Sequence, residues 1–169
     1  MKKLITAAAV VAMAMSVSTT FAQKMGRINV QEVVMAMPET QTMQTNLEAF
    51  RKDLSDNFET MQVEFNTKVA DYQKNMNTYT ASVRDLKEKE LQDLQTRMEQ
   101  FEQSAMQEIQ AKQNELLAPI INKAREAVSK VASEGGYDVV YDESAGALAY
   151  VNQSTVTDIA PLVKSNLGM

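Results

Sequence analysis

The residue types that carry most enzymatic and metal chemistry are scarce in this chain. Its 169 residues include no histidine and no cysteine, so the usual general base, the usual nucleophile and the soft metal ligands are missing. Closely spaced carboxylates such as Glu88 and Glu90 fit a solvated helix face, and Asn152-Gln153-Ser154 matches a glycosylation pattern that often arises by chance. There is also no glycine-rich phosphate-binding loop. We therefore predict that the chain is not an enzyme and has no cofactor and no metal site.

Two apolar stripes with the helical period occupy the middle of the sequence. In the first, ten steps cover the 36 residues from Met43 to Tyr79, which gives a mean spacing of 3.6 residues. The second runs from Leu94 to Val131 with one polar interruption at Gln113. These spacings predict two long, nearly straight helices, each with a single apolar face.

A polar segment between the two stripes predicts a hairpin tip near residues 76–82. The segment is rich in Asn, Thr and Ser, which compete for backbone hydrogen bonds and are unfavourable in helix interiors. Ser82 and Asp85 match a capping box that would start the second helix. The alternative is a single unbroken helix that tolerates a polar patch.

The ends of the two predicted helices define an arm over residues 39–133. Pro38 followed by Glu39 favours a helix start, and Gly135-Gly136 favours a helix end. About 38 residues at ~1.5 Å each would give an arm roughly 55 Å long. Pro119 removes a backbone donor within the second helix, so we expect a bend there, close to the junction with the rest of the chain.

Several apolar residues lie off the stripes or at the predicted tip. Two facing stripes form a thin seam without a third layer, so these residues are free to contact something else. The alternative is ordinary scattered surface apolarity. The six residues are Val63, Met76, Tyr79, Val83, Met106 and Leu117.

The first 22 residues have the form of an export signal. Lys2 and Lys3 precede an apolar run from Leu4 to Met15, and Ala22 is a small residue suited to cleavage. The run is shorter than the ~20 apolar residues that span a membrane. We predict cleavage after Ala22, secretion, and no stable membrane insertion of the mature chain.

Three segments outside the arm have strand-like patterns. They are Lys24–Val30 before the arm, and Tyr137–Tyr141 and Leu148–Val151 after it, the last two separated by a turn at Gly146. Tyr137, Val139 and Tyr141 would share one face of the sheet.

A short helix is expected to end the chain. Thr155 with Asp158 matches a second capping box, and Pro161 lies early enough in the helix to be tolerated. The residues expected to cover one face of the sheet are Ile159, Leu162, Val163 and Leu167.

These strands and this helix form a β-rich body from residues 23–38 and 134–169. A body of about 50 residues without disulfides is small for a stable independent core. We therefore expect several copies to pool their sheets, which would also cover the strand edges.

Three motifs resemble the Skp (OmpH) family of periplasmic chaperones. They are GRINVQEVVMAMPE before the arm, ASEGGYDVVYDES at its end, and ALAYVNQSTVTDIAPLVKSNL at the C-terminus. They cover about a third of the mature chain, and the hairpin between them agrees in pattern and length. The resemblance implies a homotrimer in which a small β-barrel from all three chains carries three helical tentacles around a central cavity. The residues expected in the trimer core are Ile28, Val30, Tyr137, Val139, Tyr141, Leu148 and Tyr150.

The resemblance also implies a function. It indicates an ATP-independent periplasmic holdase that keeps unfolded outer-membrane proteins from aggregating, with the six off-stripe and tip residues as candidate client contacts. The alternative is an exported coiled-coil spacer or scaffold of the cell envelope. A spacer would show tight seams and a polar exterior, whereas a holdase would expose apolar residues off the seam.

The charge pattern departs from the strongly basic character of well-known family members. Loss of the signal changes the net charge from −5 to −7, which argues against a nucleic-acid partner. Residues 68–90 carry a net charge of only +1, and residues 39–64 carry −4. We therefore assign no lipopolysaccharide site.

Overall fold

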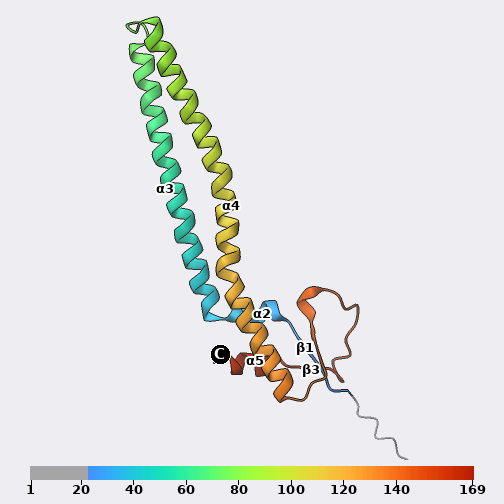
Figure 1. The fold of residues 1–169 in the computed structure, drawn as a ribbon. Coiled ribbons are helices and arrows are strands. Elements are labelled where there is room, and N and C mark those ends of the chain that lie inside the picture. The colour runs from blue at the N-terminus through green and yellow to red at the C-terminus, as the bar shows by residue number, and fades with distance from the viewer. Residues whose placement is uncertain (1–22) are drawn as a thin grey trace, which may run out of the picture.

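The computed structural model describes residues 23–169, so the predicted export signal lies outside the described residues. Over this range a long helical arm projects from a small mixed body (Figure 1). The fold is mainly helical with a small sheet, as predicted. The elements in chain order are β1 (Met25–Ile28), α2 (Val30–Ala36), α3 (Pro38–Asn75), α4 (Ala81–Glu134), β2 (Val139–Asp142), the 3-10 helix η1 (Glu143–Ala145), β3 (Thr157–Asp158) and α5 (Ala160–Asn166).

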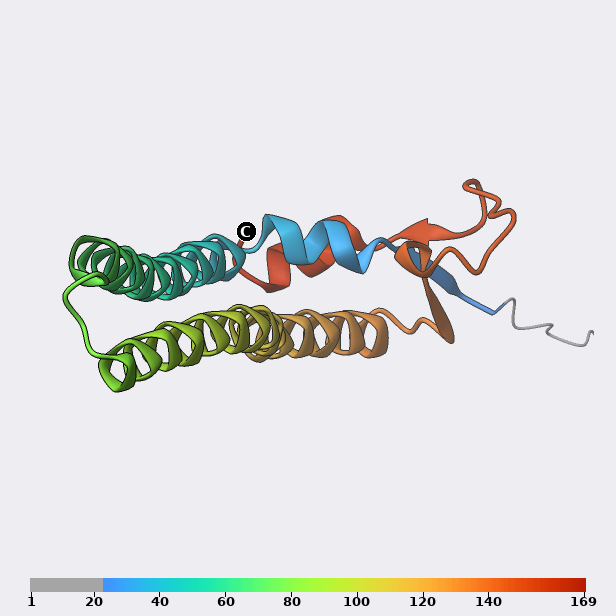
Figure 2. The same cartoon turned by 90° about the horizontal axis from the view of Figure 1, so that it is seen from above.

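Helices α3 and α4 lie antiparallel and side by side to form the arm (Figure 1 and Figure 2). α3 begins at Pro38, the position expected from the preference of proline for a first helical turn. Its 38 residues, at ~1.5 Å each, make the arm about 57 Å long. The predicted stripes meet along the seam, where Phe58 and Phe101 stack with their ring centroids 6.1 Å apart.

The arm reverses direction at residues 76–80, so the chain does not form one unbroken helix. Thr80 is the N-cap of α4, and its hydroxyl accepts a hydrogen bond from the Val83 amide at 3.4 Å. The predicted helix start at Ser82 is therefore wrong by two positions. Thr80 is extended and takes the capping position first, which leaves Ser82 inside the helix.

α4 is longer than α3 and continues past the base of the arm into the body (Figure 1). Pro119 lies inside α4 and does not end it. The helix ends at Glu134, just before the expected glycine pair, and Gly136 is left-handed with φ 65°. Gly135 has no room for a side chain, because a Cβ there would lie 2.6 Å from the Tyr137 ring.

The sheet has three strands in the order β2-β1-β3, and both pairings are parallel. The predicted strand at Leu148–Val151 is absent, and so is the hairpin around Gly146. Instead, Gly146 ends η1 in a left-handed conformation and the third strand forms at β3. β2 pairs with the distant β1 rather than with the segment that follows it, and a parallel pair cannot be joined by a tight turn.

The first strand is shorter than expected, because a helix starts within the predicted range. Asn29 is the N-cap of α2: its side chain accepts from the Glu32 amide at 3.1 Å and donates to the Glu32 carboxylate at 2.9 Å. Val30 is therefore the first residue of α2 and not a strand residue. Asp142 accepts a hydrogen bond from the Val30 amide at 3.2 Å, which links the end of β2 to the start of this helix.

The core of the body lies between the inner face of the sheet and three helices, α2, α4 and α5. Gly26 of β1 allows close packing, since a Cβ there would lie 3.2–3.3 Å from side-chain atoms of Tyr137, Val140 and Ile159. The buried residues of this cluster are Ile28, Val33, Ala127, Val131, Ile159 and Val163.

The final helix differs from its prediction in two respects. It begins at Ala160 rather than at the Thr155 capping box, because Thr157 and Asp158 pair with β1 and Ile159 becomes the N-cap. Ile159 and Val163 cover the sheet as expected, and Leu167 packs against the same core. Leu162, which was expected to do the same, is exposed.

A second apolar cluster joins the arm to the body. Val34 and Met37 pack there against Ile120 and Ala124 of α4. Leu117 packs against the same cluster, so the structure places this predicted client contact at the junction rather than on the free arm.

Candidate functional site

Two surfaces emerge as candidates, and the first is the outer face of the sheet. The parallel register places Met25 beside Val139, and Arg27 beside Tyr141, with alternate residues facing the core. Arg27 contributes charge to this face and is held by Glu143 at 3.0 Å. The face therefore combines apolar side chains with one fixed cation.

The predicted assembly residues fall into two groups. One group belongs to the chain's own core or packs against it: Ile28, Val30 and Tyr137. The other lies on the outer face of β2 or in the loop after it: Val139, Tyr141, Leu148 and Tyr150. Tyr150 is 81% exposed and Val139 40% exposed, so this second group is the one available to another molecule.

A groove of about 360 Å³ lies between α4 and the outer edge of β2. Val128 and Ala132 line it from the helix, and Tyr137 and Val140 line it from the strand side. Because β2 is at the end of the sheet, its outward-facing backbone groups have no strand partner among residues 23–169.

The second candidate surface is the shaft of the arm. Val63 is 59% exposed and Met106 is 73% exposed. The Phe58–Phe101 stack fixes which levels of α3 and α4 lie together. Val63 lies five residues from Phe58 toward the tip, and Met106 lies five residues from Phe101 toward the base. The two side chains are therefore about 15 Å apart along the arm and form separate apolar sites rather than one patch.

Exposed apolar side chains recur at the tip of the arm. Two of the residues proposed as client contacts, Met76 in the turn and Val83 just after it, are exposed. Leu86 was not among the six predicted client contacts. It is 56% exposed, and its signal in the sequence is that it is an apolar residue outside both stripes. The tip thus presents three exposed apolar side chains: Met76 at the end of α3, and Val83 and Leu86 at the start of α4.

Two tyrosines form hydrogen bonds to carboxylates near this tip. The Tyr72 hydroxyl donates across the arm to Glu88, and the Tyr79 hydroxyl donates to Asp71 at 3.0 Å. The bond to Glu88 raises the pKa of Tyr72, and burial together with the bond to Asp71 raises the pKa of Tyr79. Both rings therefore remain neutral donors at neutral pH.

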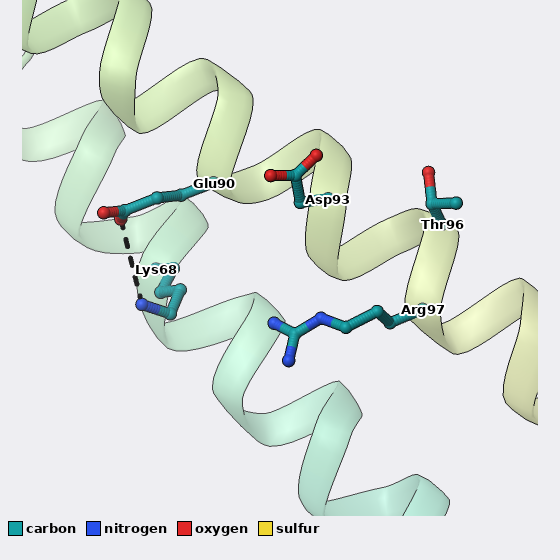
Figure 3. Close-up of a pocket in the computed structure, with 5 residues that line it drawn as sticks. All are labelled: Lys68, Glu90, Asp93, Thr96 and Arg97. Atoms are coloured by element: carbon teal, nitrogen blue, oxygen red, sulfur yellow. Dashed lines mark ion pairs between the residues drawn. The ribbon is translucent and has the colours of Figure 1, made fainter.

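A polar cleft of about 580 Å³ lies between α3 and α4 just below the tip. Lys68 of α3 is 3.9 Å from Glu90 of α4, and Arg97 extends from α4 toward α3 (Figure 3). Asp93 and Thr96 complete the lining. Cations and anions are balanced in this cleft, so it does not select a ligand of one charge.

An ion pair also crosses the arm at its base, where Lys123 of α4 bonds Glu39 of α3. This hydrogen bond lowers the pKa of Glu39, so Glu39 is a carboxylate at neutral pH. No helix among residues 23–169 is long and apolar enough to cross a membrane. The same residues contain no cluster of acidic side chains that could hold a metal ion.

The family model described as "Outer membrane protein (OmpH-like)" matches residues 24–167, which includes both the arm and the body. The chain belongs to the OmpH-like family. Among its relatives, "Chaperone protein Skp" of Yersinia enterocolitica is 32% identical, over 97% of this chain and all of the relative. The protein of the same name from Photorhabdus laumondii is 28% identical over the same shares.

A solved structure shows the same OmpH-like fold. It is an OmpH-like outer membrane chaperone from Caulobacter crescentus, with a TM-score of 0.74 at 12% identity, over 86% of this chain and 83% of that one. The OmpH-like family is a family of chaperones, so the chain is a chaperone-family protein and not an enzyme.

Proposed function

We propose that this chain is an ATP-independent holdase that binds unfolded outer-membrane proteins in the periplasm and keeps them from aggregating. The observation that carries the proposal is the combination of membership in a chaperone family with apolar side chains exposed on the outside of a long arm. The relatives are named as chaperones, and the solved neighbour is titled an outer membrane chaperone.

The geometry of the arm suits binding to many different sequences. Val63, Met106 and the three tip residues are spread along its length rather than gathered in one shaped pocket. Each contributes on the order of 1 kcal/mol when partly buried against a client. Several such weak contacts hold an unfolded chain without requiring one sequence.

The body would assemble three chains through the outer face of its sheet. The sheet has only three short strands with open edges, and Val139, Leu148 and Tyr150 beside it are exposed. Association would bury these side chains and cover the edges. The three arms would then enclose a shared space for the client.

The spacer alternative fits the structure less well. A spacer is expected to have a continuous, well-buried seam and a polar exterior. Here Val63 and Met106 are exposed outside the seam, where a purely structural rod has no use for them.

Dilution of a denatured client tests the proposal. An outer-membrane β-barrel protein in urea is diluted into buffer with or without the mature chain, in the absence of ATP, and light scattering is followed. We expect the chain to suppress scattering at a near-stoichiometric ratio. Unchanged scattering would contradict the holdase function and favour the spacer.

A further inference from the structure

The two apolar stripes of the arm do not end at the same level. The stripe of α3 continues toward the tip through Val69, Tyr72 and Met76. On the tip side of Leu94, α4 still contributes the half-buried Leu91, but it also places Glu88 and Glu90 against α3. The outer part of the α3 stripe therefore has polar neighbours across the seam.

The contacts that join the two helices change along the arm. Leu94 is the single buried residue between 48 and 119, so burial is thin on both sides of it, but in the middle of the arm the Phe58 and Phe101 rings stack across the seam. Beyond Leu94 the helices are joined by the Tyr72–Glu88 hydrogen bond and by the long 3.9 Å Lys68–Glu90 ion pair. Glu90 also pairs with Lys87 of its own helix at 3.1 Å. Exposed contacts of this kind contribute little to stability.

The base of the arm is held differently. Val34, Met37, Ile120 and Ala124 form a buried cluster there, beneath the Lys123–Glu39 ion pair. Separation of the helices at the base would expose this cluster, whereas separation at the tip would break only polar contacts and thinly covered apolar ones. The outer arm is therefore the part that is held mainly by exposed polar contacts, and local opening is expected there.

We propose that residues 66–93 form a clasp that opens independently of the rest of the arm and releases the outer α3 stripe to bind apolar segments of a client. This inference rests on the proposed holdase function. The Tyr72 hydroxyl acts as a closing contact across the arm: when the helices separate, the outer α3 stripe loses this bond to Glu88 and thinly covered apolar contacts, and it gains an apolar partner.

Hydrogen exchange on the complete mature chain tests the opening itself. We expect backbone amides of 66–75 and 81–93 to exchange at least about tenfold faster than those around Phe58 and Phe101. Y72F removes the cross-arm hydrogen bond and is expected to speed exchange of 66–93 further, by about threefold, without changing exchange near Phe58. Equal exchange in the outer and middle arm would overturn the proposal, whatever the result with clients.

A cross-link tests whether the client uses the opening. Because the chain has no cysteine, the pair K68C and E90C can be bridged by a short bis-maleimide without interference from other thiols. E39C and K123C provide the matched control, since they span the same two helices at the base. Each pair is also capped with a mono-maleimide, which modifies the thiols without bridging them.

We expect the bridged tip pair to hold a denatured outer-membrane protein at least about fivefold more weakly than its capped form, and the bridged base pair to hold it as well as its capped form. The proposal would be overturned if the bridged tip pair held the client as well as its capped form. It would also be overturned if the base bridge weakened client holding as much as the tip bridge. Failure of the unmodified chain to hold any client would instead defeat the proposed function, and the exchange data would still report on the clasp.

Discussion

The body and the arm bury their apolar residues in different ways. In the body, Val33, Ile159 and Val163 are completely inaccessible, although the sheet they cover has only three short strands. In the arm, Leu94 is the single buried residue of α3 and α4 between residues 48 and 119. The body uses its apolar residues to define its own structure, whereas the arm leaves much of its apolar surface available to other chains. The body is thus packed on its own core, and the arm is the region with apolar surface left for binding.

The largest expected effect comes from placing a charge in the core of the body. Ile28 is 1% exposed and packs within the chain, so Ile28→Asp buries an unpaired carboxylate. We expect a loss of about 3–5 kcal/mol in the free energy of unfolding, measured by urea denaturation followed by circular dichroism. If the urea midpoint of this variant were unchanged, Ile28 would not be part of a buried core.

A charge on the outer face of the same sheet should separate folding from assembly. Val139 is on this face, so we expect folded monomers from Val139→Asp in sedimentation, and trimers from the unaltered chain. Leu162→Asp is a suitable control, because Leu162 is also exposed but belongs to α5. Trimers that persist in Val139→Asp would exclude this face as the interface.

The helices of the arm could be predicted from the sequence because their signals are local. Pro38 marks the start of α3, and the glycine pair after Glu134 marks the end of α4. The 3.6-residue period shows which face of each helix contacts the other, even when the contacting residues are not known. The stripes also revealed Val63 and Met106 as residues outside the seam, and the structure exposes both.

The sheet could not be predicted in the same way, because its pairings are not local. β1 joins β2 across the whole length of the arm, and no short-range pattern specifies that parallel register. The alternation at Leu148–Val151 suggested a strand, but a strand needs a neighbour, and in the described part of the chain this segment pairs with none. The end of β1 was also predicted too late. Asn29 and Glu32 form the N-terminal cap of α2, and this cap ends the strand before Val30.

We expect client affinity to fall more when apolar side chains of the arm are removed than when its positive charges are removed. Changing Val63, Tyr79 and Met106 together to Ser removes about 1 kcal/mol per contact, so client affinity is expected to fall at least about tenfold. The matched variant changes five basic residues to Gln: Lys68, Lys74, Arg84, Lys87 and Lys89. A larger loss in this second variant, measured by fluorescence titration with an unfolded client, would show that charge at the tip dominates.

Salt is expected to have the smallest effect. The tip carries a net charge of only +1, and its ion pairs are exposed, so screening changes little, while apolar contacts are not weakened by moderate salt. Client affinity should vary by less than about tenfold, or 1.4 kcal/mol, between low and physiological salt. A steep decline of affinity with salt would indicate electrostatic capture.

The central claim is that the body assembles the chains and the arm binds the client. Shortening the arm tests this claim most directly. Residues 70–90 are replaced by a short glycine-serine turn that joins Val69 to Leu91, a connection that the nearby Lys68–Glu90 contact makes feasible. Sedimentation, thermal unfolding and suppression of client aggregation are then measured on the same sample. We expect an intact trimer, a nearly unchanged melting temperature and clearly weaker client holding. Loss of the trimer, or client holding equal to that of the complete chain, would contradict it.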